Sequence, residues 1–209
     1  MIRRVIWDLD NTLMKRDLKA EEDFFKENLS VEQGLRLISL LSEYENQFPK
    51  FDISMIASFC QQKVDFFVDE DFFRRWLHVH VEHPGSIIDG AYDVLSDLHN
   101  KGFENVVLTN DYSKYQKERL RLVGLLPYIQ EVCGGEYYFK PREEAYFAAC
   151  DSHLPRECVM VGDDLKKDVY APRSLGIISW HYNPNHRQSD YRYEIDKLEK
   201  VKEKIYENR

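Results

Sequence analysis

The sequence predicts an α/β fold in which a parallel sheet is covered by helices on both faces, with a smaller all-helical domain inserted near the N-terminus. Two observations support this prediction. Short apolar runs alternate with stretches of helical periodicity along most of the 209 residues, which is typical of parallel strands joined by crossover helices. The segment of residues 17–83 has helical spacing and no convincing strand. We therefore divide the chain into a core, residues 1–16 and 84–209, and a helical domain, residues 17–83.

The composition is that of a folded protein with one sizeable core. Apolar residues make up 43% of the chain and aromatic residues 13%, which excludes a disordered protein. The net charge of −8, with both signs mixed along the chain, argues against polymeric nucleic acid or an anionic membrane as a partner. No apolar run has the length of a membrane helix, and the N-terminus enters a strand instead of a secretory segment. We expect a cytoplasmic monomer or homodimer.

The first strand is predicted over residues 2–9, and two carboxylates follow its apolar half. Because side chains alternate along a strand, Asp8 and Asp10 leave on one side while Leu9 points towards the core. Two acids this close repel each other, so they need a raised pKa on one of them or a cation between them. Both are features of catalytic sites, although an acidic strand end is in some proteins only a turn signal.

The helical domain follows this turn and ends at Pro84-Gly85. Its aromatic residues fall at helical spacing, which is more typical of a core than of a surface that stacks on a ligand. Metal ligands are not indicated by its histidines, which lack an acidic or thiol partner in the pattern: His78, His80 and His83. The cysteines show no paired short spacing and are expected to be reduced, mostly buried thiols: Cys60, Cys133, Cys150 and Cys158.

Two later strands repeat the design of the first. Residues 105–108 are apolar and lead into Thr109 and Asn110, and the apolar run of residues 158–162 leads into further acids. Ligands of such sheets bind outside the carboxyl ends of the strands. The polar groups expected to converge there are Asp8, Asp10, Thr109, Asn110, Asp163 and Asp164.

The remaining elements complete the alternation. A weak short strand is predicted over residues 131–135 and one more strand over residues 177–180. Helices are predicted over residues 88–100, over 111–123, after Lys140-Pro141 with the proline in the first turn, and over 167–175. Residues 191–206 are predicted to form an amphipathic helix with one apolar face, made of Ile195, Leu198, Val201 and Ile205.

An oxygen-rich cluster without nearby cysteine or histidine favours a hard cation, and Mg²⁺ is the natural candidate, with Asp8 and Asp163 as side-chain ligands. A carboxylate free to attack phosphorus would form an aspartyl-phosphate, and a second carboxyl group would protonate the leaving oxygen. Thr109 fits a hydrogen-bond donor to phosphoryl oxygens and Lys140 a charge that neutralises them.

Each of these residues also has a simpler interpretation. Thr109, Asn110 or Asp111 would cap the helix that follows, and Lys140 would be a solvated lysine before a proline. Asp164 and Asp168 would be acids at a helix start. Their shared position at the strand ends of one sheet favours the functional interpretation.

Four short motifs occur in a fixed order along the chain. They are Asp8-Leu9-Asp10-Asn11-Thr12, then Thr109-Asn110, then Lys140-Pro141, then Gly162-Asp163-Asp164 with Asp168 five residues beyond Asp163. With these motifs the sequence resembles the haloacid dehalogenase (HAD) superfamily of hydrolases over almost its whole length. The resemblance implies a Rossmann-like three-layer α/β/α core, with the helical segment in the place of the family's all-helical cap.

By this resemblance, Asp8 would be the nucleophile and Asp10 the general acid/base. Mg²⁺ would be held by the carboxylate of Asp8, the backbone carbonyl of Asp10 and the carboxylate of Asp163. The other motif residues also take roles from the resemblance. Thr109 and Lys140, with Thr12 and Asn110, would bind the phosphoryl group, and Asp164 and Asp168 would be auxiliary acids.

The resemblance favours a phosphatase over a dehalogenase, because Asp10 can protonate a phosphoester leaving group and a halide needs no proton. We expect a Mg²⁺-dependent phosphatase that acts on a small phosphorylated metabolite, such as a sugar phosphate or nucleotide. The alternatives are a phosphotransferase or mutase of the same fold, and a non-catalytic regulatory binding protein. One departure from the family pattern is the acidic Asp111 after Asn110. Residues placed to contact the leaving group, which equally fit a solvated surface, are Lys15, Arg16, Arg74, Arg75 and His78.

Overall fold

A computed structural model of the protein describes residues 1–185 and 194–207. Within these residues, one sheet of six strands has the order β5-β4-β1-β6-β7-β8, and every neighbouring pair is parallel. The strands are β1 (Arg4–Trp7), β4 (Glu104–Leu108), β5 (Glu131–Cys133), β6 (Cys158–Gly162), β7 (Ile178–Tyr182) and β8 (Glu194–Ile195). The predicted parallel sheet is confirmed.

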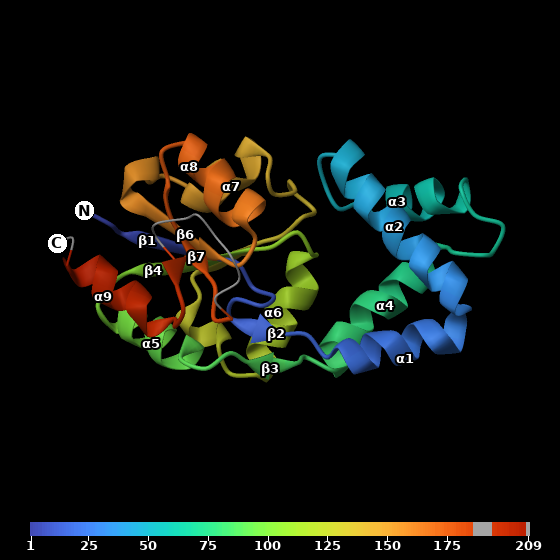
Figure 1. The fold of residues 1–209 in the computed structure, drawn as a ribbon, viewed down its shortest axis with the longest axis horizontal. Helices are drawn as coiled ribbons and strands as arrows, with labels where there is room; N and C mark the ends of the chain where they lie inside the picture. Colours follow the sequence, from blue (N-terminus) through green and yellow to red (C-terminus); the bar gives the residue numbers. More distant parts are fainter. Residues whose placement is uncertain (186–193, 208–209) are drawn as a thin grey trace.

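Helices cover both faces of this sheet. In Figure 1, α5 and α9 lie along one face and α7 and α8 along the other. The core helices are α5 (Ala91–Asn100), α6 (Ser113–Leu122), α7 (Glu143–Cys150), α8 (Ala171–Ser174) and α9 (Glu199–Glu207). Short 3₁₀ turns are η1 (Leu126–Tyr128) and η2 (Pro155–Glu157), and a π-helical turn is η3 (Leu165–Tyr170).

The side chains of β1 alternate between the two layers, as the pleat of a strand requires. Val5 and Trp7 lie in one hydrophobic cluster with residues of α5 and α9. Ile6 lies in a second cluster with residues of α7. All three are fully buried, so the strand that carries the first acidic motif is fixed from both sides. The three-layer α/β/α core is confirmed.

Residues 17–83 form four helices and no strand, as predicted. They are α1 (Leu18–Asn28), α2 (Val31–Gln47), α3 (Ile53–Gln61) and α4 (Glu70–Glu82). Each helix begins after a residue whose side chain accepts hydrogen bonds from the backbone of the first turn: Asp17, Ser30, Asp52 and Asp69. We propose that this segment is a cap, and we call it the cap segment.

The chain crosses between the core and the cap segment twice, and the two crossings run side by side. Strand β2 (Met14–Lys15) pairs antiparallel with β3 (Ser86–Ile87). Gly85 precedes β3 with φ +86°, and a Cβ atom there would lie 1.9 Å from the carbonyl oxygen of Lys15. Glycine is therefore required where the crossings meet.

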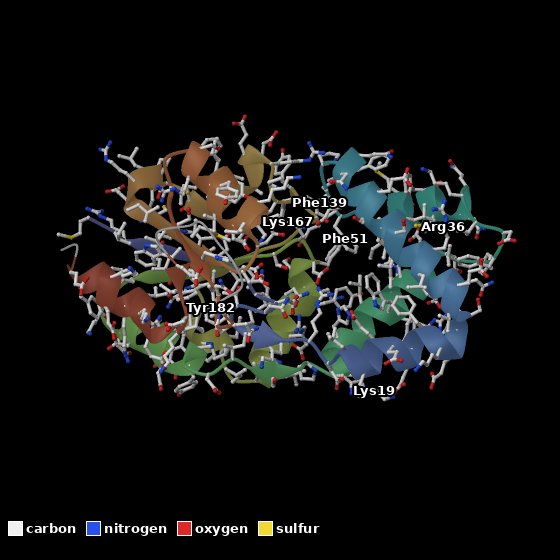
Figure 2. All side chains as sticks on the ribbon, in the orientation of Figure 1. Lys19, Arg36, Phe51, Phe139, Lys167 and Tyr182 are labelled. Atoms are coloured by element: carbon white, nitrogen blue, oxygen red, sulfur yellow. The ribbon has the colours of Figure 1, made fainter. Side chains whose placement is uncertain are left out.

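The cap segment also packs on the core. Phe139 of the core lies in the hydrophobic cluster of the cap helices, with its ring centroid 6.3 Å from that of Phe51. The N–H of Phe51 donates to the carbonyl of Gly135 (2.6 Å), and the N–H of Phe139 donates to that of Pro49 (2.8 Å). Figure 2 shows Phe51 and Phe139 where the helical segment meets the core.

The prediction that Lys140-Pro141 opens a helix is wrong. Helix α7 begins at Glu143, after a turn in which the N–H of Arg142 donates to the carbonyl of Phe139 (2.9 Å). The backbone of Lys140 is held instead by the side chain of Asn110, which bonds both its N–H (2.7 Å) and its carbonyl (3.1 Å). These bonds fix Lys140 at the strand ends and leave its backbone outside the helix.

The C-terminal helix is shorter than predicted. Residues 191–193 lie outside the described residues, and Ile195 lies in β8, where it pairs with Tyr182 of β7. Helix α9 begins at Glu199, and the apolar positions of the predicted face are nevertheless buried: Leu198, Val201 and Ile205. Pairing at the sheet edge therefore overrides helical periodicity at Ile195. Elsewhere the bounds shift by a few residues; α5, for example, begins after Gly90, whose φ is +82°.

Candidate active site

The carboxyl ends of β1, β4 and β6 border a cavity of about 250 Å³. Among the described residues, every side chain that lines this cavity is charged or carries an amide or hydroxyl group. The lining residues are Asp8, Asp10, Arg16, Glu45, Thr109, Asn110, Asp111, Lys140, Asp163, Asp164, Lys167 and Asp168. The structure thus brings together all the predicted motif residues except Thr12. Of the residues expected to contact the leaving group, Arg16 lines this cavity, and the others do not: Lys15, Arg74, Arg75 and His78.

Lys140 lines the cavity and bonds two of its aspartates. Its Nζ donates to Asp8 Oδ1 and to Asp168 Oδ1, both at 2.7 Å. The side chains of Lys140 and Asp168 are only 3% and 1% exposed, so this is a buried ion triad. Burial lowers the pKa of Lys140, but the charges of Asp168 and Asp8 outweigh it and raise the pKa well above its usual value. Lys140 is therefore a permanent positive charge beside Asp8.

The acids around this lysine resist ionisation. Burial raises the pKa of Asp8 to about 7, against the opposing effect of Lys140, and the charges of Asp168 and Asp10 add to the rise. Burial and the charge of Asp8 raise the pKa of Asp163 to about 6. Burial likewise raises the pKa of Asp168. The site holds more negative charge than its one buried lysine compensates.

A hard metal ion fits this excess charge. Carboxylate oxygens of Asp8, Asp163 and Asp168 lie within 4.8 Å of one another. Both oxygens of Asp168 have donors, since Oδ1 accepts from Lys140 and Oδ2 from the N–H of Asp164 (3.1 Å). Asp163 forms no ion pair with any described residue. The donor set is made of oxygen alone, which matches the ligand preference of Mg²⁺.

Asp10 lies between two guanidinium groups. Its Oδ2 is 3.0 Å from Nε of Arg16, and its Oδ1 accepts from Nη1 of Arg119 at 2.9 Å. Burial would raise the pKa of Asp10, but Arg16 and Arg119 outweigh burial and hold the pKa below its usual value. Arg16 also pairs with Asp111 and, at 3.4 Å, with Glu21 of α1.

Arg119 is a site residue that the sequence analysis missed. It is 1% exposed, and it also donates to Gln116 Oε1 (2.7 Å) and to the carbonyl of Pro84 (3.1 Å). A signal was present: Gln116, Arg119, Leu120 and Val123 have the i, i+3, i+4, i+7 spacing of a buried helix face. Two polar residues on such a face indicate a buried polar network.

The residues after β4 have mixed roles. Thr109 is buried and borders the cavity, and its Oγ1 accepts from the N–H of Asp111 (3.2 Å). The side-chain amide of Asn110 bonds the backbone of Lys140, as described above, and also contacts Glu45. Asn110 therefore positions the lysine of the next motif.

Two other predicted residues are placed differently from the rest. Thr12 is fully buried and does not border the cavity, and its Oγ1 has no hydrogen-bond partner among the described residues. Asp164 borders the cavity, but its Oδ1 accepts from the N–H groups of Lys166 (2.8 Å) and Lys167 (2.9 Å) and so caps η3. Asp164 therefore lies at a helix start, as in the simpler interpretation of this residue.

The cap segment contributes one residue to the cavity, which the sequence analysis also missed. Glu45 of α2 contacts the amide of Asn110 and accepts from Lys167 Nζ at 3.2 and 3.3 Å. In Figure 2, Lys167 lies on the side of the core that faces the helical segment. The cavity is therefore bounded on one side by the strand ends of the core and on the other by α2.

Comparison with known proteins identifies the family. A profile of haloacid dehalogenase-like hydrolases matches residues 2–176. The chain belongs to this hydrolase family, and the resemblance of its motifs is confirmed. None of the described helices has both the length and the apolar character needed to cross a membrane.

Relatives resemble the chain at low identity. The pyrimidine 5'-nucleotidase PynA of Streptococcus pneumoniae is 25% identical, covering 91% of this chain and 90% of its own. A phosphoglycolate phosphatase of Vibrio vulnificus is 33% identical, over 56% of this chain and 52% of its own. The structure of the putative HAD-hydrolase YfnB of Bacillus subtilis, bound to magnesium, has a TM-score of 0.74 at 23% identity and covers 98% of this chain and 99% of its own.

Proposed function

We propose that this phosphoric monoester hydrolase uses Mg²⁺ and a phosphorylated Asp8 to release phosphate from a small phosphorylated metabolite. The observation that carries the proposal is the buried triad in which Lys140 bonds Asp8 and Asp168 beside Asp163. It places a carboxylate and a fixed positive charge together at the strand ends, where the family's motifs converge. Family membership and the phosphatase relatives support the reaction class.

Asp8 is the nucleophile in this proposal. Lys140 bonds its Oδ1 and leaves Oδ2 for attack, while the positive charge favours the ionised carboxylate. A bond forms between Asp8 and phosphorus as the ester bond to the leaving oxygen breaks. Lys140 and the hydroxyl of Thr109 then neutralise and bond the phosphoryl oxygens.

Asp10 moves the proton. It protonates the leaving oxygen in the first step and accepts a proton from the attacking water in the second. In that second step the water oxygen bonds to phosphorus, the bond between Asp8 and phosphorus breaks, and phosphate leaves. Arg16 and Arg119 fix the carboxylate and favour its ionised form, which suits the second step. In the first step, the negative phosphoryl group opposes these two positive charges and favours protonation.

The carboxylates of Asp8 and Asp163 and the backbone carbonyl of Asp10 would hold Mg²⁺. When bound, the ion supplies positive charge that an acidic cavity needs to accept a phosphate. Asp168 orients Lys140, because its Oδ1 is the second acceptor of the same Nζ. Thr12, which is buried away from the cavity, is a support of the turn in this proposal and not a phosphate ligand.

The proposal is tested by phosphate release from a panel of phosphorylated metabolites, with and without Mg²⁺, for the wild type and Asp8→Asn. Release should require Mg²⁺ and fall by at least about 1000-fold in Asp8→Asn, because the nucleophile is lost. Thermal unfolding of the variant is the control for its fold. Wild-type turnover by Asp8→Asn would show that Asp8 is not the nucleophile. Suppression of phosphate release by a sugar acceptor would instead indicate a phosphotransferase.

A further inference from the structure

Among the described residues, one ion pair joins the cap segment to the core through two side chains that both line the cavity. Glu45 is the only residue of the cap segment, all of which the structure describes, that lines the cavity. Its carboxylate accepts from Lys167 Nζ at 3.2 and 3.3 Å. The two side chains are 28% and 30% exposed, so a substrate that enters the cavity can reach both.

Among the described residues that line the cavity, every cation away from Lys140 already has a carboxylate partner. Arg16 is paired with Asp10, Asp111 and Glu21, and Lys167 is paired with Glu45. A second anionic group on the substrate would meet cations that are already neutralised, and it would lie close to their carboxylates and be repelled by them. Hydroxyl groups can donate to Glu45 and accept from Lys167 without displacing either. The charges favour a neutral leaving group rich in hydroxyls.

The lining also lacks a surface for a nucleobase. Among the described residues, no aromatic or aliphatic side chain lines the cavity. Two aromatic rings at the cap junction are occupied, since Phe51 and Phe139 are 7% and 3% exposed and pack within the cap cluster. A flat apolar base gains most of its binding energy from such surfaces. A nucleotide would therefore place its base against charged groups.

We propose that the Glu45–Lys167 pair makes this enzyme selective for sugar or polyol phosphates, against nucleotides and phosphorylated carboxylic acids. The inference rests on the proposed phosphatase function and names the substrate class of the same site. Glu45 accepts hydrogen bonds from substrate hydroxyls, and it also neutralises Lys167, which would otherwise attract a substrate carboxylate. Glu45 is thus a specificity residue that the cap segment supplies.

The test compares kcat/KM for glucose 6-phosphate, glycerol 3-phosphate, phosphoglycolate and uridine 5'-monophosphate. The variants are Glu45→Gln, the double variant with Lys167→Gln, and Glu43→Gln. Glu43 is a matched control, because it lies on the same helix and its ion pair is with Lys63 of the cap segment, outside the cavity. p-Nitrophenyl phosphate serves as a generic ester, with Asp8→Asn as the inactive reference.

The wild type should prefer the best sugar or polyol phosphate by at least about 10-fold over the other two classes. Glu45→Gln should shift the ratio of that substrate to phosphoglycolate by about 30-fold towards phosphoglycolate, because Lys167 becomes free to pair with a carboxylate. The double variant should lose the gain on phosphoglycolate, and Glu43→Gln should leave the ratio unchanged.

Two results would overturn the inference alone. One is a wild-type preference for the nucleotide or for phosphoglycolate, with Asp8-dependent release of phosphate intact. The other is a ratio in Glu45→Gln that equals the ratio in Glu43→Gln. No Asp8-dependent release from any ester, p-nitrophenyl phosphate included, would overturn the proposed function first and this inference with it.

Discussion

Asp8 and Asp10 lie two residues apart at the end of one strand, yet their surroundings are opposite. Asp8 shares one lysine with Asp168, and burial raises its pKa to about 7. Asp10 has two guanidinium partners, Arg16 and Arg119, and the pKa of its carboxyl is lowered despite burial. Because their environments differ, two carboxyl groups of one site can take different chemical roles. The difference comes from residues outside the first motif, Lys140 on one side and Arg16 and Arg119 on the other.

Removing Lys140 should have the largest effect, because Asp8 then loses the cation that sets its environment apart from that of Asp10. Lys140→Met leaves two buried carboxylates without their cation, so the free energy of unfolding of the metal-free protein should fall by about 3–5 kcal/mol. Phosphate release should fall by at least about 1000-fold. Urea unfolding and steady-state kinetics measure the two losses.

Lys166→Met is the matched control for Lys140→Met, since Lys166 is exposed and does not line the cavity. The double variant Lys140→Met/Asp168→Asn should recover part of the stability, because one unpaired charge is removed, but none of the activity. Equal stability losses in Lys140→Met and Lys166→Met would show that the buried triad is absent in solution.

Removing Arg119 tests the Asp10 half and should have a smaller effect, because Arg16 remains bonded to Asp10. In Arg119→Met, the loss of three hydrogen bonds from a buried guanidinium should lower the free energy of unfolding by about 3 kcal/mol. The value of kcat should fall about 100-fold, because the acid/base is no longer fixed. Arg121→Met is the control on the same helix, where Arg121 is 58% exposed and pairs with Glu118. Unchanged kcat in Arg119→Met would exclude a positioning role.

The same contrast separates what the sequence predicts from what it does not. Alternation along β1, and the repeated design of β4 and β6, were enough to place Asp8, Asp10, Thr109 and Asp163 at one edge of a parallel sheet. These residues depend on local periodicity and on the rule for strand ends, which act over a few residues.

Residues whose role depends on how distant elements pack could not be found in this way. Glu43 and Glu45 are two acids on one helix, and nothing local distinguishes the one that reaches the cavity from the one that pairs with Lys63. Helix α2 packs on the core through Tyr44, whose ring centroid lies 6.3 Å from that of Phe139, a residue far along the chain. Ile195 was misassigned for a similar reason, because its partner is Tyr182 in a neighbouring strand.

The pH dependence of stability sharpens the comparison without changing any residue. In the unfolded chain, aspartates titrate near pH 4, whereas Asp8 and Asp163 titrate near 7 and 6 in the folded metal-free protein. Between these values the folded state holds more protons than the unfolded state, so the free energy of unfolding falls as the pH rises. From pH 5 to pH 8 we expect a loss of about 4 kcal/mol, about two thirds of it from Asp8 and the rest from Asp163. Asp10 has the opposite sign, but its lowered pKa places its effect below this range.

Thermal and urea unfolding at pH 5 and pH 8, with and without Mg²⁺, measure this dependence. Mg²⁺ should stabilise the protein more at pH 8 than at pH 5, because its carboxylate ligands are then ionised in the folded state. Asp8→Asn should weaken the pH dependence, because the group that titrates near 7 is gone and its charge no longer raises the pKa of Asp163. A metal-free protein that becomes more stable from pH 5 to pH 8 would mean that the Asp8 carboxylate is compensated as well as that of Asp10, and the contrast between the two acids would not hold.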